Sequence, residues 1–142
     1  MSYVRIWVHA VWSTKKRAPF LKKEIRNKVF IHIKHHANMM GYHVDYINGV
    51  SDHVHCLLLL REGQNLSDIM MVIKGESSHW INESHLIEEH FGWQNDYYAV
   101  STCISQLKNL RQYIKNQEQH HQSKESDFEK ELQELNMKQM AD

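Results

Sequence analysis

The stretch His53-Val54-His55-Cys56-Leu57-Leu58-Leu59-Leu60 is unusually apolar and carries two imidazoles at its head. Successive side chains of a strand point to opposite faces of a sheet, so a strand here directs His53 and His55 to the same side. The run is too short to span a membrane, and the polar residues around it predict a central strand buried on both faces. Buried imidazoles need partners, and a metal ion is one candidate.

The segments on either side of this run predict an alternation of strands and helices. The expected strands are residues 3–14, 42–50, 53–60 and 97–102, and the expected helices are residues 25–40, 65–89 and 105–121. The second and third strands are joined tightly enough to form an antiparallel hairpin. The order β-α-β-β-α-β with a last helix predicts an α+β fold of the ferredoxin-like (RRM-like) class. Its antiparallel sheet is expected to have four to five strands, with helices on its faces and one further C-terminal helix.

The length of 142 residues and a hydrophobic content of 42% predict one domain with a real core. The N-terminus lacks the pattern of a signal peptide, and no stretch approaches ~18 consecutive apolar residues. We therefore expect a cytoplasmic protein with no membrane partner. Cys56 and Cys103 lie in strand-like apolar surroundings without CxxC spacing, which predicts that both are reduced core residues.

A net charge of zero hides a strong asymmetry along the chain. Residues 1–34 carry a net charge of +8, whereas residues 122–142 carry −3. We expect an acidic, helical or partly disordered tail at 122–142 behind a folded domain at 1–121. The cluster Lys15-Lys16-Arg17, in a turn beside an aromatic strand, is the better candidate for contacting nucleic acid. The lysines between residues 22 and 34 could equally well solvate the outer face of a helix.

The last predicted helix separates an apolar stripe from a polar flank. Tyr113 and Gln117 are one helical turn apart and lie on one face, off the stripe and beside Gln106. A tyrosine on a helix is more often a core or boundary ring than a catalytic group, so both interpretations stay open. The stripe itself consists of Ile104, Leu107, Leu110 and Ile114.

A metal site would join this helix to the histidine strand. His53 and His55 would supply two nitrogen ligands and the Gln117 amide oxygen a third, with positions left for water and a substrate oxygen. Such mixed ligation suits Mg²⁺ or Mn²⁺ acting as a Lewis acid, whereas structural zinc would close its shell with cysteines. Tyr113 would then lie at the edge of the metal. An ordinary tyrosine, with a pKa of ~10, is only about a thousandth ionised at pH 7, a handicap of ~4 kcal/mol that a cation at a phosphate can offset.

Four motifs follow one another along the chain. They are His53-Val54-His55, Lys74-Gly75-Glu76-Ser77-Ser78, Trp93 with Tyr97-Tyr98-Ala99-Val100-Ser101-Thr102, and Tyr113-Ile114-Lys115-Asn116-Gln117. In this order they closely resemble the motifs of the single-tyrosine HUH transposases of the insertion-sequence 200/605 type, and relatives associated with repetitive palindromic elements look similar. The resemblance covers nearly the whole chain, from residues 9–17 to His120-His121.

The resemblance implies that residues 1–121 are an HUH transposase catalytic domain whose last helix carries the nucleophile. Tyr113 would cleave single-stranded DNA at insertion-sequence ends, form a 5′-phosphotyrosine link and free a 3′-OH that later rejoins strands. His53, His55 and Gln117 would hold one divalent metal, Mg²⁺ or Mn²⁺, and no nucleotide cofactor would be needed. The implied partners are single-stranded DNA with hairpin ends and a second copy of the chain. In such homodimers the tyrosine helix typically serves the histidine pair of the other subunit.

The expected DNA contacts lie outside this centre. Lys15-Lys16-Arg17 and Lys74 would position phosphates, while Trp7 would either stack on an unpaired base or pack at a dimer or helix interface. His9 shares a strand face with Trp7 and could approach the site, although a lone strand histidine is more often merely packed.

Two other functions stay open. One is a non-catalytic single-stranded nucleic-acid-binding module, such as a domesticated relative, and the other is a metal-dependent phosphoesterase in which water attacks and Tyr113 only packs.

Overall fold

The computed structural model describes residues 2–119, in which strands and helices alternate as expected. The predicted tail at 122–142 and the last two residues of the predicted domain lie outside the described residues. The elements are β1 (Ile6–Ser13), α1 (Lys23–Met39), β2 (His43–Gly49), β3 (His53–Leu60), α2 (Leu66–Glu83), β4 (Tyr98–Thr102) and α3 (Leu107–Lys115), with short 3-10 helices η1 (Lys15–Arg17) and η2 (Ile104–Gln106).

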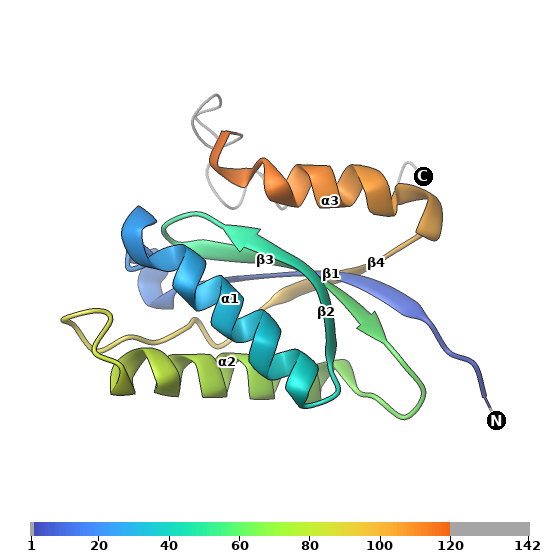
Figure 1. Ribbon diagram of the computed structural model, residues 1–142, viewed down its shortest axis with the longest axis horizontal. Coiled ribbons are helices and arrows are strands. Elements are labelled where there is room, and N and C mark those ends of the chain that lie inside the picture. The colour runs from blue at the N-terminus through green and yellow to red at the C-terminus, as the bar shows by residue number, and fades with distance from the viewer. Residues whose placement is uncertain (1, 120–142) are drawn as a thin grey trace.

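The four strands form one antiparallel sheet in the order β2-β3-β1-β4. This is the ferredoxin-like order, so the predicted fold class is confirmed, with four strands. The histidine strand β3 is internal, and His53–Leu59 are all buried, as predicted. Figure 1 shows the layers: α3 lies on one side of the sheet, and α2 lies on the other.

The face toward α1 and α2 holds the larger hydrophobic cluster. Alternation along β1 supplies Val8, Ala10 and Trp12 to this face, as the sequence pattern predicts. The two helices close the cluster with one apolar stripe each, and Gly75 does not interrupt α2. Their buried residues are Val29, Phe30, Ile33 and Ala37 on α1, and Ile69, Met70, Ile73, Ser77 and Ile81 on α2.

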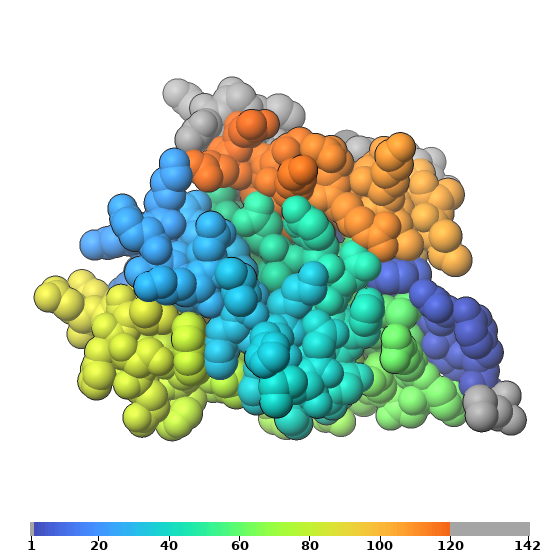
Figure 2. Space-filling view, in the orientation of Figure 1, coloured from blue at the N-terminus to red at the C-terminus, as the bar shows by residue number. Residues whose placement is uncertain are grey.

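The opposite face is covered by α3 alone within the described part of the chain, and its cluster is much smaller. It consists of Trp7, Leu57, Leu59, Leu107 and Ile114. In the space-filling view α3 forms a separate layer above β2 and α1 (Figure 2). Because α3 has only nine residues, few apolar contacts are available to hold it.

Several element ends differ from the sequence prediction for identifiable reasons. The first strand begins at Ile6 rather than Tyr3, because Ile6 already pairs with Leu60, the last residue of β3. The second long helix ends at Glu83 rather than Glu89, and the left-handed backbone of His85 (φ 52°) follows its C-cap.

The last helix is shorter than predicted at both ends. A 3-10 turn at Ile104–Gln106 precedes it and leaves Ile104 73% exposed, so Ile104 does not belong to the buried stripe. Helix α3 ends at Lys115, and a turn at Asn116 separates it from a short helical segment at 117–119. Cys103 lies in the preceding connection and is exposed, so the prediction that both cysteines are core residues is wrong for Cys103.

The β2–β3 hairpin is very tight at the end that carries His53. The N–H of Val50 donates to the carbonyl oxygen of His53 at 3.0 Å. A side chain at Gly49 would collide with that same carbonyl oxygen and approach Cα of Val54 to 3.0 Å. Glycine is therefore required where the two backbones approach each other.

No helix within residues 2–119 combines the length and apolar character needed to cross a membrane.

Candidate active site under helix α3

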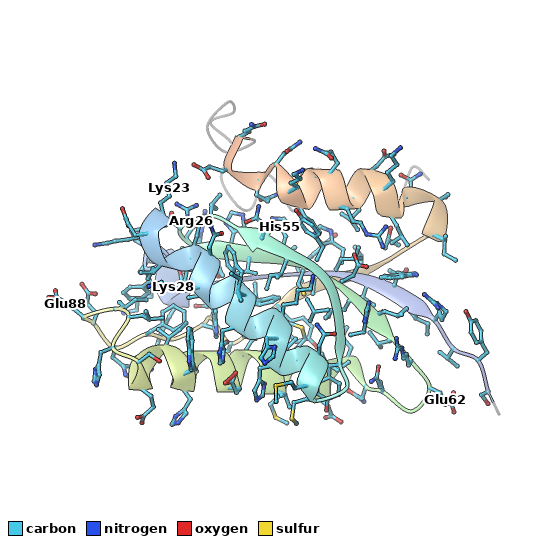
Figure 3. The ribbon with its side chains drawn as sticks, in the orientation of Figure 1. Lys23, Arg26, Lys28, His55, Glu62 and Glu88 are labelled. Atoms are coloured by element: carbon cyan, nitrogen blue, oxygen red, sulfur yellow. The ribbon has the colours of Figure 1, made fainter. Side chains whose placement is uncertain are left out.

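Strand β3 places both histidines of the His53-Val54-His55 motif on the sheet face that α3 covers. His53 pairs with Ser13 and His55 with Val11 across the central β1–β3 ladder, which makes their backbone rigid. Their side chains are 1% and 0% exposed, and the two ring centroids lie 5.2 Å apart. Figure 3 labels His55 between the sheet and α3.

Each imidazole is oriented by a hydrogen bond at Nδ1. The Asp52 carboxylate lies 2.8 Å from Nδ1 of His53, and Nε2 of His9 lies 2.9 Å from Nδ1 of His55. Nε2 is therefore the atom of each ring that could bind a cation. Sequence reasoning did not assign either partner, although Asp52 directly precedes His53 and His9 was expected on this face.

Helix α3 and the segment after it bring Tyr113 and Gln117 to the same place. The ring of half-buried Tyr113 lies 5.7 Å from that of His55, and the two planes meet at 76°. Gln117 is fully buried, and its Nε2 lies 3.5 Å from the Tyr113 carbonyl oxygen. The structure thus brings the Tyr113 ring to His55 and the Gln117 amide to the backbone of Tyr113 within one chain.

A β-bulge in β2 supplies the main polar contact that docks α3. The register shifts between Val44 and Tyr46, so Asp45 is an extra residue in the strand. The Asp45 carboxylate accepts two hydrogen bonds from the Arg111 guanidinium, at 2.7 and 3.0 Å. These bonds raise the pKa of Arg111 above its ordinary value. The guanidinium also lies 5.7 Å from the ring centroid of Trp7.

A second set of contacts fixes the C-terminal end of α3. Asn48, which pairs with His55 across the sheet, donates through Nδ2 to the carbonyl oxygens of Ile114 and Lys115, both at 3.1 Å. These carbonyls belong to the last turn of the helix, where partners from outside the helix are needed. Lys23, at the start of α1 (Figure 3), forms an ion pair at 3.2 Å with Glu118, which lies three residues after the end of α3.

The buried side chains fit a divalent cation held by two imidazoles and one amide. The Oε1 atom of Gln117 is buried, and no hydrogen-bond donor among the described residues reaches it. A cation at this position would satisfy that oxygen, and mixed nitrogen and oxygen ligation with open positions suits Mg²⁺ or Mn²⁺. No group of three or more His, Cys, Asp or Glu side chains in residues 2–119 is arranged to hold a metal, so within these residues a third ligand beside the two imidazoles would come from the Gln117 amide.

The predicted DNA-contacting turn lies beside this centre. Lys15, Lys16 and Arg17 are exposed and form η1 directly after β1. Lys16 and Arg17 both have left-handed backbone conformations, with φ of 57° and 55°, which are uncommon for residues other than glycine. Nε of Arg17 lies 3.7 Å from the carboxylate of Asp52. The basic turn therefore contacts the residue that orients His53.

Lys74 has surroundings that the sequence did not predict, whereas Trp7 follows one of its two predicted alternatives. Nζ of Lys74 donates to the carbonyl oxygens of residues 94, 95 and 96 at 2.5, 2.9 and 3.2 Å, and burial lowers its pKa. Lys74 therefore holds this segment, whose Gln94 side chain accepts from the backbone N–H of Lys16. Trp7 is only 7% exposed and packs under α3, which corresponds to the helix-interface alternative.

Comparison with known proteins identifies a family for this chain. A family model described as "Transposase IS200 like" matches residues 2–117, which is most of the chain. The chain belongs to the IS200-like transposase family. No curated protein matches this transposase-family chain.

Two solved structures have a similar fold. One is a candidate transposase from Deinococcus radiodurans R1, which is 23% identical, with a TM-score of 0.64; the match covers 80% of this chain and 91% of the other. The second is a REP-associated tyrosine transposase bound to a REP hairpin, which is 17% identical, with a TM-score of 0.61, covering 85% of this chain and 72% of the other. At these identities the likeness concerns the fold.

Proposed function

We propose that this IS200-like transposase cleaves and rejoins single-stranded DNA at insertion-sequence ends, with Tyr113 as the nucleophile. The observation that carries the proposal is the position of Tyr113, whose ring lies 5.7 Å from that of the buried His55, one turn before the buried Gln117. A tyrosine that only packed would not need two oriented imidazoles and an amide oxygen beside it.

The proposed step exchanges one phosphodiester for another. The Tyr113 hydroxyl oxygen attacks the phosphorus, a new P–O bond to tyrosine forms, and the P–O3′ bond breaks. The proton lost by the phenol is balanced by the proton gained at the leaving 3′ oxygen. Rejoining reverses the step with a 3′-OH as the attacking group. No net hydrolysis occurs, so neither a nucleotide cofactor nor a redox partner is required.

The residues around Tyr113 have distinct proposed roles. His53, His55 and Gln117 hold a divalent cation, Mg²⁺ or Mn²⁺, which supplies Lewis-acid stabilisation of the charge on the phosphate when bound. Asp52 orients His53 through its 2.8 Å contact. Burial of the three ligand side chains excludes water, which strengthens electrostatic interactions at the site.

The proposed DNA path continues from this centre to the basic turn. The basic turn projects positive charge next to the Asp52–His53 pair. Its side chains, which contact phosphates of the bound strand, are Lys15, Lys16 and Arg17.

We propose single-stranded DNA with hairpin ends as the substrate and a homodimer as the working assembly. In support, one neighbour of similar fold is a transposase bound to a REP hairpin.

The test is a search for a covalent protein–DNA adduct. Oligonucleotides carrying a hairpin and a randomised single-stranded flank are labelled at the 3′ end, because a 5′-phosphotyrosine link keeps the downstream strand on the protein. With Mg²⁺ or Mn²⁺ we expect a labelled adduct on a denaturing gel. The adduct should disappear in Tyr113→Phe and persist in Tyr3→Phe, which changes a tyrosine that is 83% exposed and outside the sheet.

Two results would contradict the proposal. Cleavage that survives Tyr113→Phe without an adduct would identify a phosphoesterase in which water attacks. Binding of a selected oligonucleotide without any cleavage, with either metal present, would favour a non-catalytic single-stranded nucleic-acid-binding module. Sedimentation of the protein with and without the selected DNA tests the homodimer.

A further inference from the structure

His9 is a buried polar residue of this face to which the proposed chemistry gives no role. It lies on β1, is 0% exposed, and its Nε2 is 2.9 Å from Nδ1 of His55. The two rings meet edge to edge and are close to coplanar, with centroids 5.1 Å apart and 28° between their planes. We propose that His9 is a positioning residue that fixes the rotamer and the tautomer of His55 for cation binding. This inference rests on the proposed function.

The sheet register explains why the two imidazoles meet. His9 pairs with Leu57 across the β1–β3 ladder, so His55, two residues away on β3, is its diagonal neighbour on the same face. Both strands are internal, and α3 covers this face of the sheet. The contact is therefore set by backbone pairing, and neither ring can turn into solvent without opening the site.

The hydrogen bond also couples the position of the proton on one ring to that on the other. A neutral imidazole has one N–H donor and one acceptor nitrogen. A cation at Nε2 of His55 requires a lone pair there, so His55 carries its proton on Nδ1 and donates it. Nε2 of His9 must then accept, which places the proton of His9 on its own Nδ1. One contact thus couples the tautomers of the two rings, and the arrangement in which His55 donates is the one that leaves Nε2 of His55 able to bind a cation.

The two proposed histidine ligands are consequently oriented by different chemistry. His53 faces a carboxylate, that of Asp52, whereas His55 faces a neutral imidazole. A carboxylate makes a ligand more basic but adds negative charge to a site that must accept a phosphodiester anion. An imidazole acceptor orients the second ligand without that added charge.

The experiment uses His9→Leu, His9→Gln and, as a control, His32→Gln. Leucine fills a similar volume without an acceptor, while the Gln side chain can place an oxygen near the position of Nε2. His32 lies on α1, on the other side of the sheet, and contacts Glu76 at 2.7 Å. Long-range ¹H–¹⁵N NMR of the metal-free full chain reports the tautomer of His55. Electron paramagnetic resonance measures the Kd for Mn²⁺, and urea unfolding confirms that each variant is folded.

We expect the Nδ1–H tautomer of His55 in the wild type and in His9→Gln, and a mixture of tautomers in His9→Leu. The Kd for Mn²⁺ should rise by about 10–100-fold in His9→Leu and by less than about tenfold in His9→Gln, with no change in His32→Gln. A wild-type His55 protonated on Nε2 would overturn the inference. Equal Mn²⁺ affinity in the wild type and folded His9→Leu would also overturn it.

Failure of the strand-transfer proposal and failure of the His9 inference give different combinations of results. A wild type that binds Mn²⁺ but forms no adduct would contradict the strand-transfer proposal and leave the role of His9 supported. If the wild type binds no Mn²⁺, the tautomer measurement alone decides whether His9 controls His55. If His9→Leu does not fold, the tautomer of the wild type and of His9→Gln decides the question.

Discussion

The two faces of the sheet are built on different principles. The face toward α1 and α2 is a broad apolar cluster, and its buried polar contacts include the hydrogen bond that Nε1 of Trp93 donates to the Ser77 hydroxyl at 2.9 Å. The face toward α3 has a cluster of five buried apolar residues together with a group of buried histidines, and its helix is held by Asp45, Asn48 and their partners. The first face supplies most of the apolar burial that stabilises the fold. The second face has a smaller apolar core and more buried polar groups.

This difference indicates that α3 is the less stable layer. The free energy gained by burying apolar surface is roughly proportional to the area buried. A nine-residue helix on a small cluster therefore opens more easily than a layer of two long helices. The polar contacts of α3 are directional and fix the position of Tyr113. We expect changes on the first face to affect global stability, and changes on the second to affect the position of one helix.

The largest expected effect is a difference in the free energy of unfolding between two leucine substitutions on β3, one on each face of the sheet. Leu58 and Leu59 are neighbours on β3, 1% and 2% exposed, and belong to the larger and the smaller cluster. Leu58→Ala should lower the free energy of unfolding by about 2–5 kcal/mol, because two packed helices cannot collapse into the cavity. Leu59→Ala should cost less, since α3 can move to fill the space. Urea unfolding measures both, and equal costs would contradict the difference between the faces.

A smaller effect concerns the docking of α3 alone. Arg111→Ala removes the paired hydrogen bonds to Asp45, and because the Arg111 side chain is 40% exposed we expect a loss of only about 1 kcal/mol. The amides of α3 should then exchange about fivefold faster in hydrogen-exchange mass spectrometry, while those of β1 and β3 are unchanged. Glu76→Gln breaks a comparably short pair with His32 on the other face and should not affect α3. Unchanged exchange in Arg111→Ala would show that apolar contacts suffice to hold the helix.

The smallest effect is a chemical difference between the two cysteines. Cys56 is fully buried in the larger cluster, where burial raises the pKa of its thiol, whereas Cys103 is exposed in the connection before α3. An aromatic disulfide reagent should therefore modify one thiol per native chain and two per chain in denaturant. Cys103→Ser should abolish the native reaction, and rapid modification of Cys56 would mean that the larger face opens readily.

The sequence predicted those features that depend on local periodicity. Alternation along β3 placed His53 and His55 on one face, and helical spacing placed Tyr113 near Gln117. It did not predict contacts that depend on how distant strands align. The bulge at Asp45 has no glycine or proline to mark it, and the contact between His9 and His55 exists only in the observed β1–β3 register. Lys74 binds carbonyls of a segment about twenty residues further along, which no local pattern reveals.

The close approach of Gly49 to the first residue of β3 gives the hairpin an unexpected sensitivity. A single methyl group at position 49 would meet the carbonyl oxygen of His53 and must displace one of the two backbones. Since the neighbouring residue of β2, Asn48, holds the end of α3, a displacement there would be felt by both the ligand strand and the tyrosine helix. Because Gly49 has no side chain, the histidine strand and the tyrosine helix can keep their present separation. Gly49→Ala would change the alignment of these two parts of the proposed centre without replacing any reacting group.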